Sequence, residues 1–371
     1  MLKMKMTNVT SSIPSTSHST PTSVSRLAQK ETSSDYAVLK QQLKQQGFLN
    51  KQPVYYTWRI IFLFALLAIG VGILLLVHIP WLQLLDAIYL ACVSTQIGLL
   101  AHEAGHRQMF HHAWQHNLVS LIGGNFLLGM SATWWNDKHN RHHSHPNQLD
   151  MDPDIEIPFL DFTGTQALEQ MNPFRQFLIR HQAFLFLPAL MTVGVGLQYQ
   201  SILFLLRKQA KYHALEWILM VAHFVCYFAL IFSCLPFWQA VVFIALHQSF
   251  TGLYLGSIFA PNHKGMVILE NESNMDFLHR QVVTSRNIYA HPWTDFWYGG
   301  LNYQIEHHLF PAMPRNRLKE AQQLIKPFCE AHAISYHETS ALQSFREILQ
   351  YLHEIGAPLR SPSQPKQKNI N

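Results

Sequence analysis

Histidines recur in three short clusters whose spacing suits metal binding. In "HEAGH" two histidines stand at i and i+4. In "HNRHH" three stand at i, i+3 and i+4, and "QIEHH" repeats that spacing with glutamine first. On a helix, side chains at these spacings share one face and lie roughly 5–6 Å apart. The clusters therefore predict metal ligation by His102, His106, His139, His142, His143, Gln304, His307 and His308. His263, in "APNHKG" after an apolar segment, is a further candidate ligand.

The first cluster also matches the H-E-x-x-H pattern of zinc proteases. In that pattern His102 and His106 would hold zinc while Glu103 acts as general base. Such a site leaves the other two clusters unexplained, and about eight imidazoles are too many for one tetrahedral zinc. Two metal ions are the expected number, and imidazole suits zinc, copper and iron alike. Glu103 and Glu306 would then orient imidazoles, or be solvated helical carboxylates.

The composition indicates a membrane protein. Of 371 residues, 49% are hydrophobic and 13% charged, against about 25% charged in soluble domains. Apolar segments 60–77, 81–100, 215–234 and 241–260 are each about long enough to cross a ~30 Å hydrocarbon core. They form two hairpins whose short connections lack Lys and Arg, whereas basic residues flank every other end. Both hairpins should therefore enter from the cytoplasm and return to it. The basic residues form no stripe, so no nucleic-acid partner is expected.

The remaining segments complete the expected architecture. Apolar segments 118–135 and 183–206 have basic residues on both sides, which favours in-plane or re-entrant helices. The start "MLKMKMTNVTSS" has no apolar core of signal-peptide length, so insertion should depend on the first span. We predict an all-α integral membrane protein with four transmembrane helices, cytoplasmic termini and a cytoplasmic helical cap holding the two metals. Its parts are a disordered tail (1–35), a membrane domain (36–314), the cap (315–360) and a second disordered tail (361–371).

The three clusters resemble the histidine boxes of membrane fatty acid desaturases. Those boxes read H-x(3-4)-H, H-x(2-3)-H-H and [HQ]-x(2)-H-H, and glutamine in the third is typical of front-end and linoleoyl-type members. The surrounding "WWNDKHNRHHSHPN", "DPDI" and "TSRN" agree, and the resemblance covers about residues 58–314. Many front-end members carry a fused cytochrome b5 domain with an H-P-G-G motif, which this sequence lacks.

The resemblance implies an O2-dependent enzyme that introduces a cis double bond into a fatty acyl chain, carried on a lipid or CoA. It implies a non-haem centre of two iron ions, with the eight histidines as ligands and Gln304 at a ligand position as a weaker donor than imidazole. Electrons would come from an external ferredoxin or cytochrome b5. The membrane would be the inner membrane in a bacterium or the endoplasmic reticulum in a eukaryote. Other readings are a histidine-box lipid hydroxylase, a sphingolipid desaturase, and a histidine-rich metal transporter, which should place its ligands near the bilayer midplane.

Several other residues carry weaker expectations. His111, His112 and His145 lie off the shared faces, and His247 should bond a neighbouring helix rather than line an acyl tunnel. We expect interface anchors rather than channel walls at Trp134, Trp135, Trp293, Trp297 and Tyr303. An acidic electron carrier would dock on Lys138, Arg141, Arg315, Arg317 and Lys319, unless these charges only set topology or bind anionic lipid.

Overall fold

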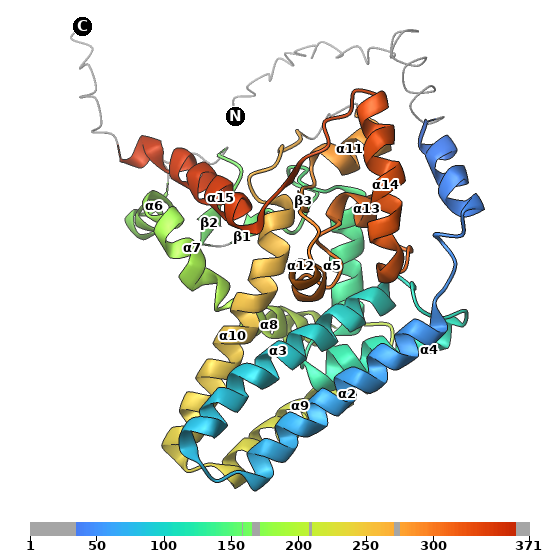
Figure 1. Cartoon of the computed structure of the whole chain (residues 1–371). Coiled ribbons are helices and arrows are strands. Elements are labelled where there is room, and N and C mark those ends of the chain that lie inside the picture. The colour runs from blue at the N-terminus through green and yellow to red at the C-terminus, as the bar shows by residue number, and fades with distance from the viewer. Residues whose placement is uncertain (1–34, 158, 165–170, 208–209, 271–274, 361–371) are drawn as a thin grey trace, which may run out of the picture.

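The computed structural model describes residues 35–157, 159–164, 171–207, 210–270 and 275–360. The predicted disordered tails therefore lie outside the described residues, apart from Asp35. The described chain is mostly helical (Figure 1). It has four helices long and apolar enough to span a membrane: α2 (Pro53–Leu76), α3 (Pro80–Gly105), α9 (His213–Cys234) and α10 (Phe237–His263). These correspond to the four predicted spans.

The four long helices form two hairpins, α2 with α3 and α9 with α10, which meet at the lower end of Figure 1. Pro80 lies in the first turn of α3, where a missing N–H and a fixed φ are tolerated. Helix α3 is central, because most of its side chains are buried, whereas α2 and α9 expose apolar side chains along most of their length. This pattern fits helices whose outer surface faces lipid.

The two apolar segments that were predicted to lie in the membrane plane or re-enter it are each bent. Helix α4 (Ala113–Ser120) continues into a π-helix, η1 (Leu121–Leu127), and α5 (Ala132–Ser144) then turns away by 110°. Helices α7 (Gln182–Leu190) and α8 (Val193–Leu206) meet at 72°. The count of spans is therefore four, or up to six if each bent pair crosses the membrane, and the in-plane placement stays a prediction.

The rest of the chain gathers beyond one end of the hairpins (Figure 1). It contains α6 (Pro173–Arg180), α11 (Phe277–Val283), α12 (Pro292–Trp297), α13 (Gln304–Leu309), α14 (Arg315–Ala331), α15 (Ala341–Ile355) and a 3-10 turn, η3 (Ala357–Leu359). Strands β1 (Glu156–Ile157) and β2 (Leu160–Asp161) pair antiparallel, and β3 (Asn287–Ile288) and β4 (Glu338–Thr339) pair in parallel.

The predicted cap, residues 315–360, packs closely on the rest of the chain. Apolar side chains of α14 share a buried cluster with α11, α13 and the helical residues 35–45. Helix α15 packs its apolar face against α7 and α10, and the buried Arg286 pairs with Glu347 on α15 at 2.5 Å. These contacts fix α13 and the end of α10, which both carry candidate ligands. A domain boundary at residue 314 stays a prediction.

Candidate metal centre

The fold brings all eight predicted histidines together. They come from the end of α3 and the residue after it, from α5, from the last residue of α10 and from α13. A five-histidine group consists of His102, His106, His139, His143 and His307. A three-histidine group consists of His142, His263 and His308. Within each group, one ring nitrogen per residue lies within 4.8 Å of all the others.

The ring nitrogens converge closely. The Nε2 atom of His139 lies 2.8 Å from that of His102 and 2.9 Å from that of His106. In the other group, the Nε2 atoms of His142 and His263 are 3.3 Å apart. The groups adjoin each other, because the rings of His143 and His308 stack with centroids 4.2 Å apart. The arrangement can therefore hold two neighbouring ions.

Unpaired nitrogens test whether the residues fit metal ions. Both ring nitrogens of His307 and Nε2 of His308 are buried without a hydrogen-bond partner among the described residues. A buried polar atom without a partner is unfavourable, so such atoms indicate a missing ligand or ion. Burial, followed by nearby histidine charges, holds the pKa of His307 and of His308 well below the ordinary value. Both rings are thus neutral, the form that binds metal. The donor set fits two transition-metal ions.

Hydrogen bonds to Nδ1 orient the three-histidine group. His142 Nδ1 lies 2.9 Å from the Asp152 carboxylate. His263 Nδ1 donates to the Thr284 carbonyl oxygen at 3.0 Å, and His308 Nδ1 lies 2.9 Å from Gln281 Oε1. These contacts leave each Nε2 directed at the site, as is usual for metal-bound imidazoles. Our sequence reasoning missed Asp152, Gln281 and Thr284, although Asp152 begins the quoted "DPDI" and Thr284 begins "TSRN".

Replacing Asp152 should weaken metal binding in the three-histidine group. Backbone N–H groups of Asn147 and Asp154 also donate to Asp152, which fixes the carboxylate that orients His142. We expect Asp152→Asn to lower metal affinity roughly 10–100-fold, measured as metal retained against a chelator. Asp137→Asn, on an exposed side chain of α5, is the matched control. Equal retention in both variants would show that Asp152 does not position His142.

The two glutamates that were predicted to orient imidazoles contact other groups. Glu103 is 3% exposed and faces Arg315 at 3.6 Å. Glu306 is fully buried and accepts hydrogen bonds from Asn287 and Tyr336. Burial raises the pKa of Glu306 to about 7. Neither glutamate orients a ligand imidazole directly, and neither is a solvated carboxylate. Both expectations were therefore wrong.

Gln304 lies against the three-histidine group. Its side-chain nitrogen is 2.8 Å from His263 Nε2, and its oxygen accepts a hydrogen bond from Asn262 at 2.9 Å. Its ligation of metal stays a prediction. The other nearby histidines lie outside both groups, since His111 and His112 are exposed and His145 contacts Gln148 through Nδ1.

An apolar cavity begins at the five-histidine group and runs between α3, α8, α9 and α10. His102 and Trp135 line the part of the cavity next to the candidate ligands, and the Trp135 ring stacks on His139 with centroids 5.1 Å apart. Trp135 thus lines this cavity rather than anchoring the chain at the membrane surface, contrary to expectation. Trp134 and Tyr303 are buried and so are not interface anchors either, whereas Trp293 and Trp297 are exposed.

The five cations proposed for docking a carrier are already paired. Lys138 pairs with Asp154, Arg141 with Asp137 and Arg317 with Glu320. Lys319 lies 3.6 Å from Asp295, and Arg315 is buried beside Glu103. The side chains of Arg141, Arg317 and Lys319 stay 36–58% exposed beside these partners, so carrier docking on these residues stays a prediction.

Comparison with known proteins identifies the family. The family model described as "Fatty acid desaturase" matches residues 79–340. A Physcomitrium patens "Acyl-lipid (9-3)-desaturase" is 28% identical over 86% of this chain, which spans 62% of that relative's length. A Borago officinalis protein of the same name is 26% identical, and the match covers 92% of this chain and 79% of that protein's length. The Caenorhabditis elegans "Delta(6)-fatty-acid desaturase fat-3" is 28% identical, and the match covers 91% of this chain and 78% of that protein's length. The chain therefore belongs to the fatty acid desaturase family, a family of oxidoreductases, as the three histidine clusters predicted.

Proposed function

We propose that this protein is an O2-dependent acyl desaturase that forms a cis double bond in a fatty acyl chain of a membrane lipid or CoA ester. The observation that carries the proposal is the apolar cavity, which His102 and Trp135 line beside the five-histidine group. A methylene chain lying in it would pass beside the five-histidine group. The names of the relatives, acyl-lipid and fatty-acid desaturases, support the substrate class.

Two iron ions are the proposed metals, one held by each histidine group. An interior methylene has no acidity that a general base can exploit, so a redox metal must supply the oxidising power for breaking its C–H bonds. The residues of this chain orient the substrate and exclude water. Trp135 and Leu99 wall the cavity beside the ligands, and apolar side chains line most of its remaining length. A dry, shaped site keeps the oxidising chemistry on the acyl chain.

We further propose that the histidine groups and both termini face the cytoplasm. The ligands on α3 and α10 stand at the ends of these helices rather than at their centres. This position argues against a metal transporter, which would bind its ion near the midplane. Basic flanks on the same side support the orientation.

The direct test is expression of the chain in a host that lacks the product, with fatty acids compared by gas chromatography. We expect a new unsaturated fatty acid that depends on the chain. A hydroxylated product would favour the hydroxylase, and an unchanged profile with the protein present in the membrane would count against both enzymes.

Gln304 offers a separate prediction about ligand number. Because its nitrogen faces His263 and its oxygen is bonded to Asn262, we expect Gln304→Ala to keep both irons. Gln304→His should keep iron too but change turnover, because a stronger and bulkier donor alters the metal geometry. Metal analysis beside product formation checks both variants. Loss of iron from Gln304→Ala would instead identify the amide as an essential ligand.

A further inference from the structure

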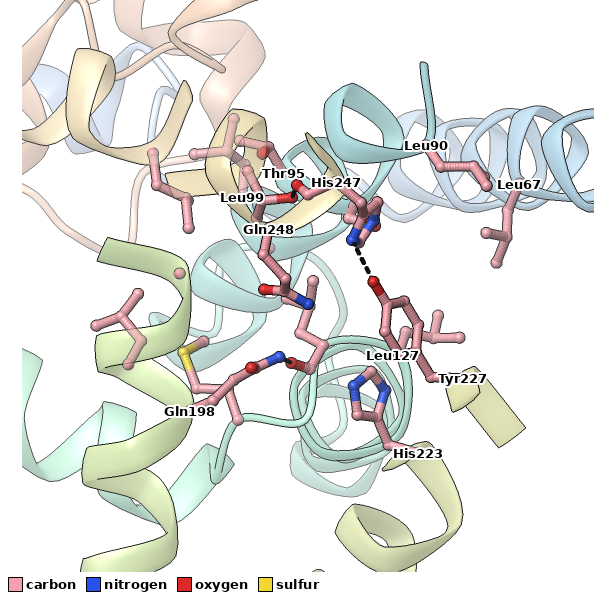
Figure 2. Close-up of a pocket in the computed structure, with 18 of the residues that line it drawn as sticks. Leu67, Leu90, Thr95, Leu99, Leu127, Gln198, His223, Tyr227, His247 and Gln248 are labelled. Carbon is pink, nitrogen blue, oxygen red and sulfur yellow. Dashed lines mark hydrogen bonds between the residues drawn. The ribbon is translucent and has the colours of Figure 1, made fainter. Parts of the chain in front are cut away.

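Two polar side chains that line the apolar cavity bond to other segments of the chain (Figure 2). Nδ1 of His247 lies 3.1 Å from the Tyr227 hydroxyl, and its Nε2 lies 3.4 Å from Ser94 Oγ. Gln198 donates a hydrogen bond to the Leu128 carbonyl oxygen at 2.8 Å. His247 thus bonds neighbouring helices, as predicted, although it lines the cavity as well. Because these polar groups are engaged within the chain, the cavity suits an apolar ligand.

A second pocket, of about 280 Å³, also borders α5, but the residues that line it are mostly polar. Trp135 of α5 lines the apolar cavity, whereas Asp137 of the same helix lines this pocket. Lys211, which also lines it, lies two residues before α9, a helix long and apolar enough to span a membrane. The pocket therefore lies at the level where a span meets the lipid headgroups. We call it the polar pocket, and its charged lining residues are Arg107, Asp137, Lys211 and Glu216.

The two cations of the polar pocket form no ion pair within the described residues. Arg107 and Lys211 are both exposed to solvent. The two acids of the pocket are engaged instead, because Asp137 pairs with Arg141 at 3.2 Å and Glu216 accepts hydrogen bonds from three polar side chains. The charged groups of this pocket that can still bind a ligand are therefore positive.

The backbone holds Arg107 in an uncommon conformation. Its φ is 55°, in the left-handed region that side-chain-bearing residues seldom adopt. Its N–H donates to the Ala104 carbonyl oxygen at 3.0 Å, and Lys51 Nζ donates to its own carbonyl oxygen at 2.5 Å. Residues in such conformations cluster at functional sites. These bonds fix the point at which the chain leaves α3, directly after the candidate ligand His106, and they place a cation at the polar pocket.

We propose that the polar pocket binds the phosphate group of a membrane phospholipid between Arg107 and Lys211. Guanidinium and ammonium groups are the side-chain cations that bind phosphate in proteins. Apolar side chains favour a lipid over a soluble phosphate, because Trp114 and Leu118 of α4 and Leu215 in the first turn of α9 are 44–63% exposed. The acyl tails would lie against these side chains. A bound phosphate would link the end of α3 to the start of α9, so the lipid should stabilise the fold.

The test compares four lipids that carry the same acyl chains, added to the full-length protein purified in mild detergent. Two contain phosphate, phosphatidylglycerol and phosphatidylethanolamine, and two lack it, diacylglycerol and a galactolipid. We expect the phospholipids alone to be retained in native mass spectrometry and to raise the melting temperature. Arg107→Gln and Lys211→Gln should each weaken phospholipid binding roughly ten-fold, as loss of one charge-assisted contact would give. Arg180→Gln, on an exposed side chain of α6 outside the polar pocket, should bind like the wild type.

The outcomes separate a phosphate site from weaker kinds of lipid contact. Equal retention of all four lipids would show that the apolar surface alone holds them, and equal weakening in Arg180→Gln would show a general effect of charge; either overturns the proposal. Stabilisation by inorganic phosphate or coenzyme A as large as that by phospholipid would identify a soluble ligand and contradict the lipid. Should Arg107→Gln fail to fold, Lys211→Gln and the wild-type comparison still decide. Because no readout uses turnover, failure here leaves the proposed function intact.

Discussion

Replacing His142 or His307 by alanine should abolish desaturation while leaving the protein in the membrane. His142 belongs to the three-histidine group and His307 to the five-histidine group, so each variant would remove a proposed ligand from a different proposed iron. Both side chains are at most 3% exposed, and alanine has no donor atom to replace the lost imidazole nitrogen. We expect product below detection by gas chromatography, together with loss of bound iron.

The control for this pair is His111→Ala. His111 follows the first histidine cluster in the sequence, but it is exposed and belongs to neither group. The His111→Ala variant should retain activity and iron. Normal turnover by His142→Ala or His307→Ala, with membrane insertion equal to wild type, would show that the replaced imidazole is not a required ligand.

The second large effect is on turnover, which should require an external electron carrier. Forming one double bond while O2 is reduced to water consumes four electrons, of which the acyl chain supplies two. The printed sequence contains no H-P-G-G haem motif, no G-x-G-x-x-G fingerprint and no cysteine cluster that could hold iron and sulfur. We therefore expect the purified protein with NAD(P)H and O2 to be inert. Adding a reductase with ferredoxin or cytochrome b5 should start turnover.

Carrier docking can be tested in the same assay. The five basic residues named from the sequence have acidic partners within the chain, so single replacements such as Lys319→Ala should change turnover little. A large, salt-sensitive loss in Lys319→Ala would instead support carrier docking on these basic residues. Sustained turnover with NAD(P)H and no added carrier would contradict the need for an external donor.

Local spacing explains what the sequence could predict. His139, His142 and His143 lie on one helix, so i, i+3 and i+4 spacing was enough to predict that they share a face, but not that His142 joins a different group from His139 and His143. The four long apolar runs likewise fixed the spans. Even His263 could be found, because it follows the predicted span 241–260 on the side where the three clusters were expected.

Contacts between distant segments explain what the sequence could not predict. Gln281 on α11 hydrogen-bonds His308 on α13, and Glu103 on α3 pairs with Arg315 on α14, although the members of each pair are far apart in the sequence. No periodicity reports such pairs. The same holds for Trp135, whose place in the cavity wall depends on the bend between η1 and α5. A tryptophan near a membrane surface looks the same in the sequence whether it faces lipid or the metal site.

The ratio of metal to protein in the purified chain tests the central claim most directly. Two histidine groups, each with converging ring nitrogens, predict about two irons per chain, measured by elemental analysis of protein extracted from membranes in mild detergent. One stoichiometric zinc, with peptidase activity that disappears in Glu103→Gln, would contradict the desaturase account and restore the protease reading of "HEAGH".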